Sequence, residues 1–555
     1  MDWKVAIGTD DFAEVRKDYY FADKTNFISE FFSSHSKVTL ITRPRRFGKS
    51  LLLSMMQRFL DIRNAEENRK LFDGLRVSHD ARAMAEQGKR PVVFVTLKDW
   101  ASGLSWEAMQ ERITLGVSEM VAPFRFLMDS DAVDEADKKA LSLLRSCEGN
   151  ITRVRSAMAL LSKMLHDHYG KPVVLLIDEY DAPIQYAWAN GYYRDAIDFF
   201  RNFFSAAFKS NPYLDFAILT GVLRIAKESI FSGLNNVEVS SVLSGGYPDA
   251  CGYTKEEVAE MARAFGCEDK LSELAEWYDG YSFDGVDIYN PWSVNNYIKR
   301  KCDANAYWVN TSSNSIFPVI LSQADEMRWE ELRSLLFGGT VTIALREGII
   351  YDEIGRNSND IYSLLLQTGY LKSVNAIHLR SGGYLYELAI PNKEIRLLYQ
   401  TEILNRVDRS YGEVSFYKMG LAMERGDAKE FQKQLQGILV RAVSSHDAAQ
   451  PESFYHGLML GCALFYEADY RVESNQESGY GRFDLAMFPK AQTLPGVLME
   501  FKSVKEEAEL EAAATAACEQ MQEKAYAMRL RTEGVTTIWQ YGIAFCKKHA
   551  LVKMM

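Results

Sequence analysis

Two short groups of residues in the first half of the chain have the chemistry of a nucleotide site. Gly48-Lys49-Ser50 stands between a β-type run, Val38–Thr42, and a helical pattern from Leu51 to Leu60. In such a strand–loop–helix unit, backbone N–H groups and the helix N-terminus face phosphate, a lysine reaches the β- and γ-phosphates, and a serine ligates Mg²⁺. The residues expected to bind the nucleotide are Arg45, Arg46, Phe47, Gly48, Lys49 and Ser50.

The loop departs from the usual phosphate-binding pattern at its first position. That pattern has a glycine five residues before the second glycine, whereas this chain has Arg43, followed by Pro44. The loop is consequently stiffer and more cationic than the usual one. Taken alone, it fits an ordinary strand–helix turn as well as it fits a nucleotide site.

Two acids end a later strand-like run. Val173–Ile177 is followed by Asp178 and Glu179. In phosphate-loop enzymes an aspartate at this position holds Mg²⁺, and a following glutamate polarises the attacking water. The alternative is a pair of acids that face solvent or cap a helix. In combination with the loop, the acids favour a site for ATP and Mg²⁺, with the metal on Ser50 and Asp178 and Glu179 as the base.

The run Phe216–Thr220 supplies two further candidates. Thr220 is placed to sense the γ-phosphate or the attacking water, and Arg224 and Lys227 follow in the next turn. An arginine at this point can act as a finger that stabilises the transition state. That role would require a lid movement or a neighbouring subunit of a homo-oligomer. The alternative for Arg224 is a surface ion pair.

A second group of chemical residues lies towards the C-terminus. Glu500 and Lys502 are two residues apart on the run Val497–Lys502, so they project from the same face of a strand. Asp484, on a preceding strand, can reach that face if the strands pair. Such a group suits a Mg²⁺-dependent phosphodiesterase, in which Asp484 and Glu500 hold metal and Lys502 orients or deprotonates water. The alternative is a solvated face with a cross-strand ion pair.

The acid that would complete this second site is not obvious, and the candidates are Glu467, Glu473 and Glu477. From Pro451 to Met555 the chain has 11 Lys/Arg and 14 Asp/Glu, a net of 11 − 14 = −3. DNA binding there would therefore depend on a local basic patch together with metal.

The elements that must position these groups alternate between strand and helix. Candidate strands at Val38–Thr42, Val92–Leu97, Val173–Ile177 and Phe216–Thr220 are separated by longer helical patterns, which predicts a mostly parallel sheet covered by helices. A chain of 555 residues also exceeds one core. We expect an α/β protein with a P-loop domain over 1–245, a helical lid over 246–310, a mainly helical connector over 311–445 and an α/β domain over 446–555. A long helix from Glu506 to Leu530 is expected in the last of these.

Composition and charge indicate which classes of protein this chain can belong to. Hydrophobic content of 47% and charged content of 25% are typical of soluble globular proteins. No apolar run approaches the ~20 residues that span a bilayer, and no signal peptide is apparent. Seven cysteines without a Cys-x-x-Cys pair predict reduced thiols in a cytoplasm. We expect no membrane partner, because no apolar run is long enough to span a bilayer. A net charge of −11 argues against a protein that coats nucleic acid generally.

Several segments together resemble a known family. They are Tyr20-Phe-Ala-Asp-Lys-Thr25, Thr42-Arg-Pro-Arg-Arg-Phe-Gly-Lys-Ser50, Leu176-Ile-Asp-Glu-Tyr-Asp-Ala-Pro183, Leu219-Thr-Gly-Val-Leu-Arg-Ile-Ala-Lys-Glu-Ser229, Tyr289-Asn-Pro-Trp-Ser293 and Ser474-Asn-Gln-Glu-Ser-Gly-Tyr-Gly-Arg-Phe-Asp484. They span nearly the whole chain. In them the chain resembles the bacterial AAA-ATPase-like family with a C-terminal PD-(D/E)xK nuclease-like domain, related to the archaeal-type ATPases of the signalling NTPase group.

This resemblance carries expectations of its own. It implies that Arg43 belongs to the family's own form of the loop, and that Tyr20–Thr25 lies near the nucleotide base. It implies a restriction-endonuclease-like fold for the C-terminal domain. Gln522-x-x-x-Tyr526 resembles the helix motif of many nucleases in this superfamily, which implies that Gln522 lies near the metals and contacts DNA.

Two hypotheses of different class follow. In the first, the protein is an ATP-driven, nuclease-type effector, in which the nucleotide state gates a Mg²⁺-dependent site that acts on DNA. In the second, it is a nucleotide-dependent switch or scaffold, whose C-terminal domain binds partners or nucleic acid without cutting. Cleavage of a plasmid that is lost in both Asp484→Ala and Lys502→Ala would separate the two.

Overall fold

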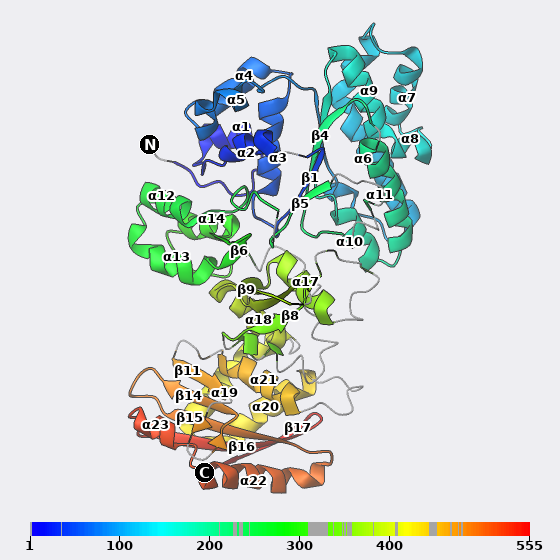
Figure 1. Cartoon of the computed structure of the whole chain (residues 1–555). Helices are drawn as coiled ribbons and strands as arrows, with labels where there is room; N and C mark the ends of the chain where they lie inside the picture. Colours follow the sequence, from blue (N-terminus) through cyan, green and yellow to red (C-terminus); the bar gives the residue numbers. More distant parts are fainter. Residues whose placement is uncertain are drawn as a thin grey trace. The chain divides into compact units, whose positions relative to one another are not determined.

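The computed structural model describes most of the chain. It describes residues 3–555 except 35, 210, 226–229, 232–236, 244, 309–330, 333, 337, 347, 349–350, 352–357, 381, 406–408, 443–451, 465, 467–468, 475–476 and 479–480. The chain divides into two compact units (Figure 1). The N-terminal unit contains Met1–Thr311 and Thr342–Glu394, and the C-terminal unit contains Ser312–Val341 and Ile395–Met555.

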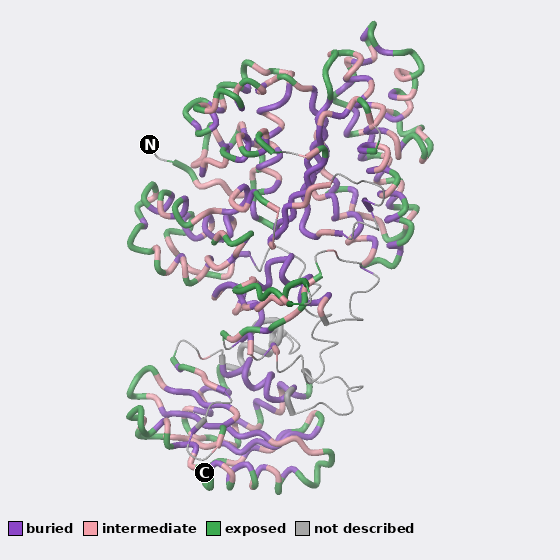
Figure 2. Tube along the Cα trace, in the orientation of Figure 1, coloured by how far each residue is buried: buried purple, intermediate pink, exposed green. Residues whose placement is uncertain are grey.

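A five-stranded parallel sheet forms the centre of the N-terminal unit. Its strands are β1 (Val38–Thr42), β2 (Val92–Thr96), β3 (Val173–Asp178), β4 (Leu214–Gly221) and β5 (Val237–Ser240), in the order β2-β3-β4-β1-β5. The apolar runs predict four of these strands, and β1 and β3 are buried along their whole length (Figure 2). Thr42 pairs with Gly221 in β4, so the carboxyl ends of β1 and β4 meet at one edge.

Helices cover both faces of this sheet, as expected for parallel strands joined by crossovers. The longer ones are α1 (Phe12–Asp18), α2 (Asn26–Ser34), α3 (Lys49–Leu60), α6 (Trp106–Val121), α7 (Glu135–Arg145), α9 (Ala157–Tyr169), α10 (Ala182–Ala189) and α11 (Tyr193–Phe208). The shorter ones are α4 (Ala65–Arg69), α5 (Ala81–Met84) and α8 (Ile151–Arg155). The phenylalanines of α11 form its core face, with Phe199, Phe200, Phe203 and Phe204 fully buried.

A small helical subdomain follows the sheet. Its helices are α12 (Lys255–Phe265), α13 (Leu271–Tyr278) and α14 (Pro291–Lys299), with a hairpin of β6 (Tyr281–Phe283) and β7 (Val286–Ile288) between the last two. Thr254 and Glu257 form a capping box at the start of α12, and Asn290 caps α14. A core around Leu274, Tyr278 and Tyr297 holds the three helices together. This helical subdomain lies in the range 246–310, which the sequence predicts to be a lid; we refer to it as the lid, and its function as a lid stays a prediction.

The expected connector contains strands as well as helices. Its helices include α17 (Ser358–Thr368) and α18 (Lys393–Asn405). Its strands β8 (Val341–Ile343), β9 (Lys372–His378) and β10 (Tyr384–Ala389) form a sheet in the order β8-β10-β9. α19 (Arg409–Arg425) and α20 (Ala428–Ala442) follow. The antiparallel hairpin β9–β10 lies within the expected connector, and the bounds 311–445 of that connector stay a prediction.

The C-terminal sheet is mixed. Its order is β11-β14-β15-β16-β17, formed by β11 (Tyr470–Ser474), β14 (Leu485–Pro489), β15 (Gly496–Ser503), β16 (Ile538–Cys546) and β17 (His549–Met554). Only β15 and β16 are parallel among its pairs. A minor ladder pairs β12 (Glu477–Ser478) with β13 (Gly481–Arg482). α21 (Glu452–Leu464) and α22 (Leu510–Glu523) pack on the sheet, and α23 (Met528–Thr532) follows α22.

The helix expected from Glu506 to Leu530 is divided in two. α22 ends at Glu523, and Ala525 has a φ of +53°. A left-handed residue cannot continue an α-helix, so the chain turns before α23 begins.

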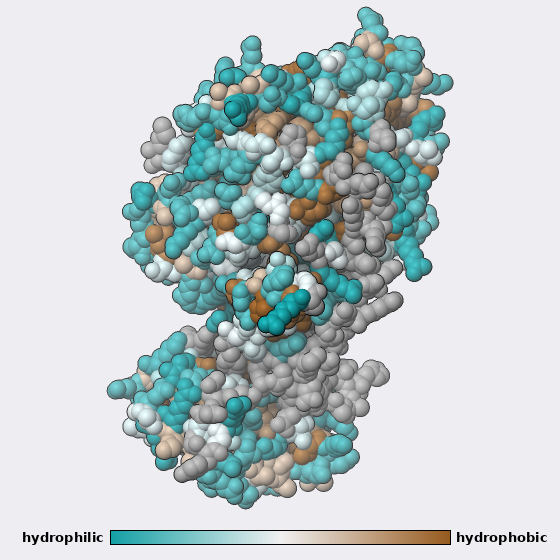
Figure 3. Space-filling view, in the orientation of Figure 1, coloured by the Kyte–Doolittle hydropathy of each residue, from teal (hydrophilic) through white to brown (hydrophobic). Residues whose placement is uncertain are grey.

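The exposed surface is mixed in polarity. The face in Figure 3 is largely hydrophilic, with hydrophobic residues scattered between polar ones. Within the part of the chain that the structure describes, no helix has the length and apolar character needed to cross a membrane.

Candidate nucleotide and nuclease sites

The loop between β1 and α3 presents the N-terminus of a helix. Gly48 precedes the first helical residue, Lys49, with a φ of +88°. Glycine adopts this left-handed conformation without the strain that a side chain would add. Arg45, Arg46 and Gly48 are exposed, whereas Arg43 and Lys49 are buried. The backbone at the tip is therefore accessible, while two cationic side chains point into the protein.

Arg43 is an internal anchor of this loop. Its guanidinium donates to the carbonyl oxygens of Thr42 (2.9 Å), Ser240 (3.0 Å) and Tyr247 (2.9 Å), and it lies over the ring of Phe283 at 5.0 Å. Burial lowers the pKa of Arg43 to about 10, which leaves it charged at neutral pH. The residue that replaces the usual glycine thus joins β1 to the end of β5 and to the lid hairpin, and its side chain does not occupy the space at the loop tip.

The predicted residues Lys49, Ser50, Asp178 and Thr220 lie together. The two oxygens of Asp178 accept hydrogen bonds from Ser50 Oγ and Thr220 Oγ1, each at 2.5 Å. Lys49 Nζ donates to the carbonyl oxygens of Arg43 (3.0 Å) and Pro44 (2.8 Å). Burial lowers the pKa of Lys49, and the negative charge of Asp178 opposes that effect. A hydroxyl, a carboxylate and an ammonium group at a helix N-terminus fit a phosphate group with a divalent cation.

Glu179 stands beside this cluster in an unusual backbone conformation. Its φ is +50°, a left-handed value that is uncommon for a non-glycine residue and that is found at functional sites. The side chain is half-buried. Burial raises its pKa, and the neighbouring charge of Asp178 raises it further. A carboxylate with a raised pKa accepts a proton more readily, as a general base must.

Tyr180 and Asp181 are residues at this site whose individual roles the sequence did not indicate. Asp181 accepts the backbone N–H groups of Val222 (3.0 Å) and Leu223 (2.7 Å). Tyr180 Oη donates to the carbonyl oxygen of Leu223 (2.7 Å) and accepts from the N–H of Ile225 (3.1 Å). Both side chains therefore fix the segment that follows β4. Their place within the Leu176–Pro183 segment indicated that both residues lie near the site, but nothing in that segment indicated their hydrogen-bond partners.

Gly221 allows this packing. A Cβ added at Gly221 would lie 2.5 Å from Asp181 Oδ1 and 2.6 Å from the ring of Tyr180. The close approach keeps the end of β4, with Thr220, against the end of β3.

The other residues predicted to bind the nucleotide, Arg45, Arg46 and Phe47, lie along the loop. Arg45 Nη2 donates to Gln185 Oε1 at 3.2 Å, and the guanidinium of Arg46 lies over the ring of Trp292 at 4.3 Å. Phe47 is fully buried against Tyr281 and Phe283 of the lid hairpin, so only its backbone can face a ligand.

Arg224 and Lys227 follow the end of β4. Arg224 is half-buried, and its backbone N–H donates to Gln367 Oε1 at 2.9 Å. Lys227 lies outside the described residues. The finger role of Arg224 stays a prediction.

Tyr20–Thr25 joins the N-terminal segment to the lid. Lys24 pairs with Glu257 of α12 at 2.5 Å and donates to the carbonyl oxygen of Asp249 at 2.9 Å. Thr25 is buried and accepts the N–H of Val77. These contacts are structural, and the expected proximity of this segment to the nucleotide base stays a prediction.

In the C-terminal unit, Asp484 and Glu500 come together where β14 and β15 pair. Asp484 Oδ2 accepts the N–H of Phe501 at 2.7 Å, and Glu500 Oε1 accepts Lys502 Nζ at 3.3 Å and the amide of Gln520. Glu500 is 2% exposed, and its Oε2 is buried without a hydrogen-bond partner in the described part of the chain. Burial, followed by the charge of Asp484, raises the pKa of Glu500 to about 8. A buried carboxylate oxygen without a donor, next to a second carboxylate, fits a divalent cation.

His456 adds a group to this site that no motif in the sequence indicated. It lies on α21 and is 5% exposed. Its Nε2 is 2.8 Å from Ser474 Oγ, and its Nδ1 is 3.8 Å from Asp484 Oδ1. Only the packing of α21 against β11 and β15 brings the imidazole to the carboxylate.

The glutamine at the carboxylate pair is Gln520. Besides contacting Glu500, its amide lies 3.2 Å from the hydroxyl of the buried Tyr526. Gln522 is exposed on α22. Four-residue spacing aligns two side chains only within one helix, and the turn at Ala525 ends α22 between Gln522 and Tyr526. The role expected for Gln522 stays a prediction.

The third acid of this site also stays a prediction. Glu473 forms ion pairs with Arg529 (2.7 Å) and Arg471 (3.1 Å), Glu467 lies outside the described residues, and the side chain of Glu477 is not described. Among the residues that the structure describes, no three or more His, Cys, Asp or Glu side chains are grouped so that they could hold a metal.

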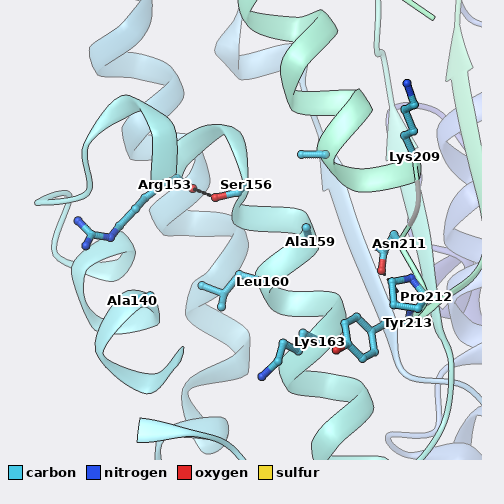
Figure 4. Close-up of a pocket in the computed structure, with 11 residues that line it drawn as sticks. Ala140, Arg153, Ser156, Ala159, Leu160, Lys163, Lys209, Asn211, Pro212 and Tyr213 are labelled. Atoms are coloured by element: carbon cyan, nitrogen blue, oxygen red, sulfur yellow. Dashed lines mark hydrogen bonds between the residues drawn. The ribbon is translucent and has the colours of Figure 1, made fainter. Parts of the chain in front are cut away.

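A surface cavity of about 390 Å³ lies elsewhere in the N-terminal unit (Figure 4). Its lining includes Arg153, Leu160, Lys163, Lys209 and Tyr213. Lys163 already pairs with Asp137 and Asp167. The cavity contains none of the predicted site residues.

Comparison with known proteins matches both parts of the chain. Residues 6–231 match the model of the family described as predicted AAA-ATPase, and residues 450–554 match that of the PD-(D/E)XK nuclease superfamily. The chain is also 27% identical over 543 residues to an uncharacterized protein in the vnfD 5' region of Azotobacter chroococcum mcd 1, covering 96% of this chain and 94% of that protein. No solved structure gives a significant match. The chain therefore carries an AAA-ATPase-like domain, followed by a domain of the PD-(D/E)XK nuclease superfamily.

Proposed function

We propose that the N-terminal domain binds and hydrolyses ATP with Mg²⁺, and that its nucleotide state controls a metal-dependent, nuclease-like C-terminal domain that acts on DNA. The observation that carries the first part is the cluster around Asp178. Its two oxygens accept hydrogen bonds from the hydroxyl groups of Ser50 on α3 and Thr220 on β4, so the cluster joins three elements, because Asp178 itself ends β3. An ordinary strand–helix turn gives no reason for this convergence.

Within this site each side chain has a distinct task. Ser50 and Asp178 would hold the cation, and Lys49 would exchange its loop carbonyl acceptors for phosphate oxygens. Mg²⁺, when bound, supplies positive charge that stabilises the charge developing on the transferred phosphoryl group. Glu179 would take the proton of the attacking water, and Thr220 would orient that water or the γ-phosphate. Tyr180 and Asp181 hold the backbone of the segment from which Arg224 projects.

In the C-terminal domain, Asp484 and Glu500 would hold the metal. Glu500 Oε2 is the oxygen that needs a positive partner, because it is buried and accepts no hydrogen bond from the residues that the structure describes. Lys502 Nζ, 3.3 Å from Glu500 Oε1, would orient or deprotonate water. Gln520 fixes the Glu500 carboxylate, and His456 faces Asp484. A metal there would stabilise the charge that develops on the phosphate of the nucleic acid.

A second candidate is a nucleotide-dependent switch or scaffold that binds nucleic acid or partners without cutting. It is favoured by the ion pairs of Glu473 with Arg471 and Arg529, which occupy the one described candidate for a third acidic ligand. The seven cysteines are free thiols, in keeping with a reducing compartment such as a cytoplasm for either candidate.

Equilibrium binding of ATP to the full chain, followed by phosphate release with Mg²⁺, tests the first part. Wild type and Lys171→Ala, an exposed lysine, should bind and hydrolyse alike, whereas Lys49→Ala should lose both activities. Plasmid cleavage with Mg²⁺ or Mn²⁺ and ATP tests the second part. We expect cleavage by wild type and Lys490→Ala, and loss in Asp484→Ala and Lys502→Ala. Absence of ATP binding by wild type would refute the proposal, and ATP binding without cleavage under any condition would leave the switch.

A further inference from the structure

Trp308 holds the phosphate loop from outside the sheet. Its indole N–H donates to the carbonyl oxygen of Arg45 at 3.1 Å. The side chain is 2% exposed, and its ring packs against Tyr370 at 5.3 Å between centroids. The peptide that follows Arg45 is therefore held by a donor that comes from 263 residues further along the chain.

A second tryptophan reaches the same segment. The guanidinium of Arg46 lies 4.3 Å from the ring of Trp292 on α14, and the indole N–H of Trp292 donates to the carbonyl oxygen of Tyr307 at 3.2 Å. The two exposed arginines of the loop are thus connected, through two indole rings, to the adjacent residues Tyr307 and Trp308.

Trp308 also contacts the buried Glu394. Its backbone N–H donates to Glu394 Oε1 at 2.6 Å, and Glu394 Oε2 accepts the hydroxyl of Ser293 at 2.8 Å. The chain passes between the two compact units after Thr311 and after Glu394. Trp308 thus lies three residues before one of these passages, and Glu394 is the last residue before another.

We propose that Trp308 is a positioning residue that fixes the Arg45 peptide of the phosphate loop and couples nucleotide binding there to the passages into the C-terminal unit. The inference rests on the proposed nucleotide site. Phosphate binding by loop N–H groups reorients the loop peptides, and a reoriented Arg45 carbonyl changes its bond to the indole. Buried, close-packed groups transmit such a displacement because they do not deform gradually. Trp308 therefore moves with Glu394, the second residue of α18, whose remaining residues belong to the C-terminal unit.

A purely structural role predicts something different. In that case, removal of the indole N–H would lower stability and leave the response of the C-terminal unit to nucleotide unchanged. Trp308→Phe keeps a ring against Tyr370 and removes the donor. Trp539→Phe is the matched control, because its indole N–H also donates to a backbone carbonyl, that of Glu424 at 3.0 Å, within the C-terminal unit.

The experiment uses the full chain with a non-hydrolysed ATP analogue and has two readouts. The first is the analogue's dissociation constant, and the second is its effect on amide hydrogen exchange over residues 395–405. We expect Trp308→Phe to bind the analogue about 2- to 10-fold more weakly, the worth of one hydrogen bond. At saturation it should lose at least half of the exchange change seen in wild type and in Trp539→Phe.

Each outcome either supports or overturns the proposed coupling. A full exchange response in saturated Trp308→Phe, or none in saturated wild type, would overturn the coupling while the nucleotide site stands. Failure of wild type to bind the analogue would overturn the proposed function itself, and the coupling with it. If Trp308→Phe does not fold, the Ser293→Ala variant tests the proposal in its place. It loosens Glu394 without touching the loop, so it should weaken the exchange response and leave the dissociation constant unchanged; a full response would overturn the proposal.

Discussion

Glu394 makes the stability of the N-terminal unit depend on pH. Its carboxyl is fully buried, and burial raises its pKa from 4.5 to about 7, against the opposing effect of the Trp308 N–H and the Ser293 hydroxyl. One pKa unit corresponds to about 1.36 kcal/mol, so the shift is worth about 3 kcal/mol. Because the folded state has the higher pKa, this contribution is fully present below about pH 4.5 and is lost as the pH rises through about 7.

Glu394→Gln tests this magnitude, since glutamine keeps an acceptor for the Trp308 N–H and cannot ionise. Urea unfolding, followed by tryptophan fluorescence, gives the difference in unfolding free energy between variant and wild type at pH 5 and at pH 8. The variant should gain about 2.5 kcal/mol relative to wild type between these values, because part of the contribution is already lost at pH 5. Glu276→Gln, a change at an exposed glutamate that pairs with Lys393, should show little pH dependence. A difference for Glu394→Gln that does not vary with pH would refute the raised pKa.

Three further predictions concern the two candidate sites. Phe47→Ala should cost about 3–5 kcal/mol in thermal or chemical unfolding, because a fully buried ring leaves a cavity; a loss below about 1 kcal/mol would contradict the anchoring of the loop to the lid. Asp181→Ala should lower the ATP turnover number with little change in nucleotide affinity, because the N–H groups of Val222 and Leu223 lose their acceptor; equal losses in both constants would contradict a role confined to the segment after β4. Asp484→Asn should reduce the rise in melting temperature that Mn²⁺ gives the wild type, and an unchanged rise would place the metal elsewhere.

Local patterns in the sequence predicted the frame of the nucleotide site. The strands β1, β3 and β4 follow from their apolar runs. The turn before α3 follows from Gly48, because glycine adopts a φ of +88° without strain. Since polar residues directly follow or end these runs, Asp178 and Thr220 had to lie at strand ends. Parallel pairing then places those ends at one edge, as the bond between Thr220 and Asp178 demonstrates. The positions of these residues were therefore predictable, because they depend only on neighbours in the sequence.

The direction and partners of the other side chains depended on the tertiary structure. Arg43 made the loop more cationic than the usual phosphate-binding loop, but its side chain points inward because carbonyl groups of β5 and residue 247 meet it there. His456 meets Asp484 only because α21 packs on β15. Trp308 reaches the loop across 263 residues. The sequence by itself determined which strand ends and which loop carry the chemistry, because these are local properties. The structure alone decided which distant groups hold them, because hydrogen bonding and burial depend on segments that meet only after folding.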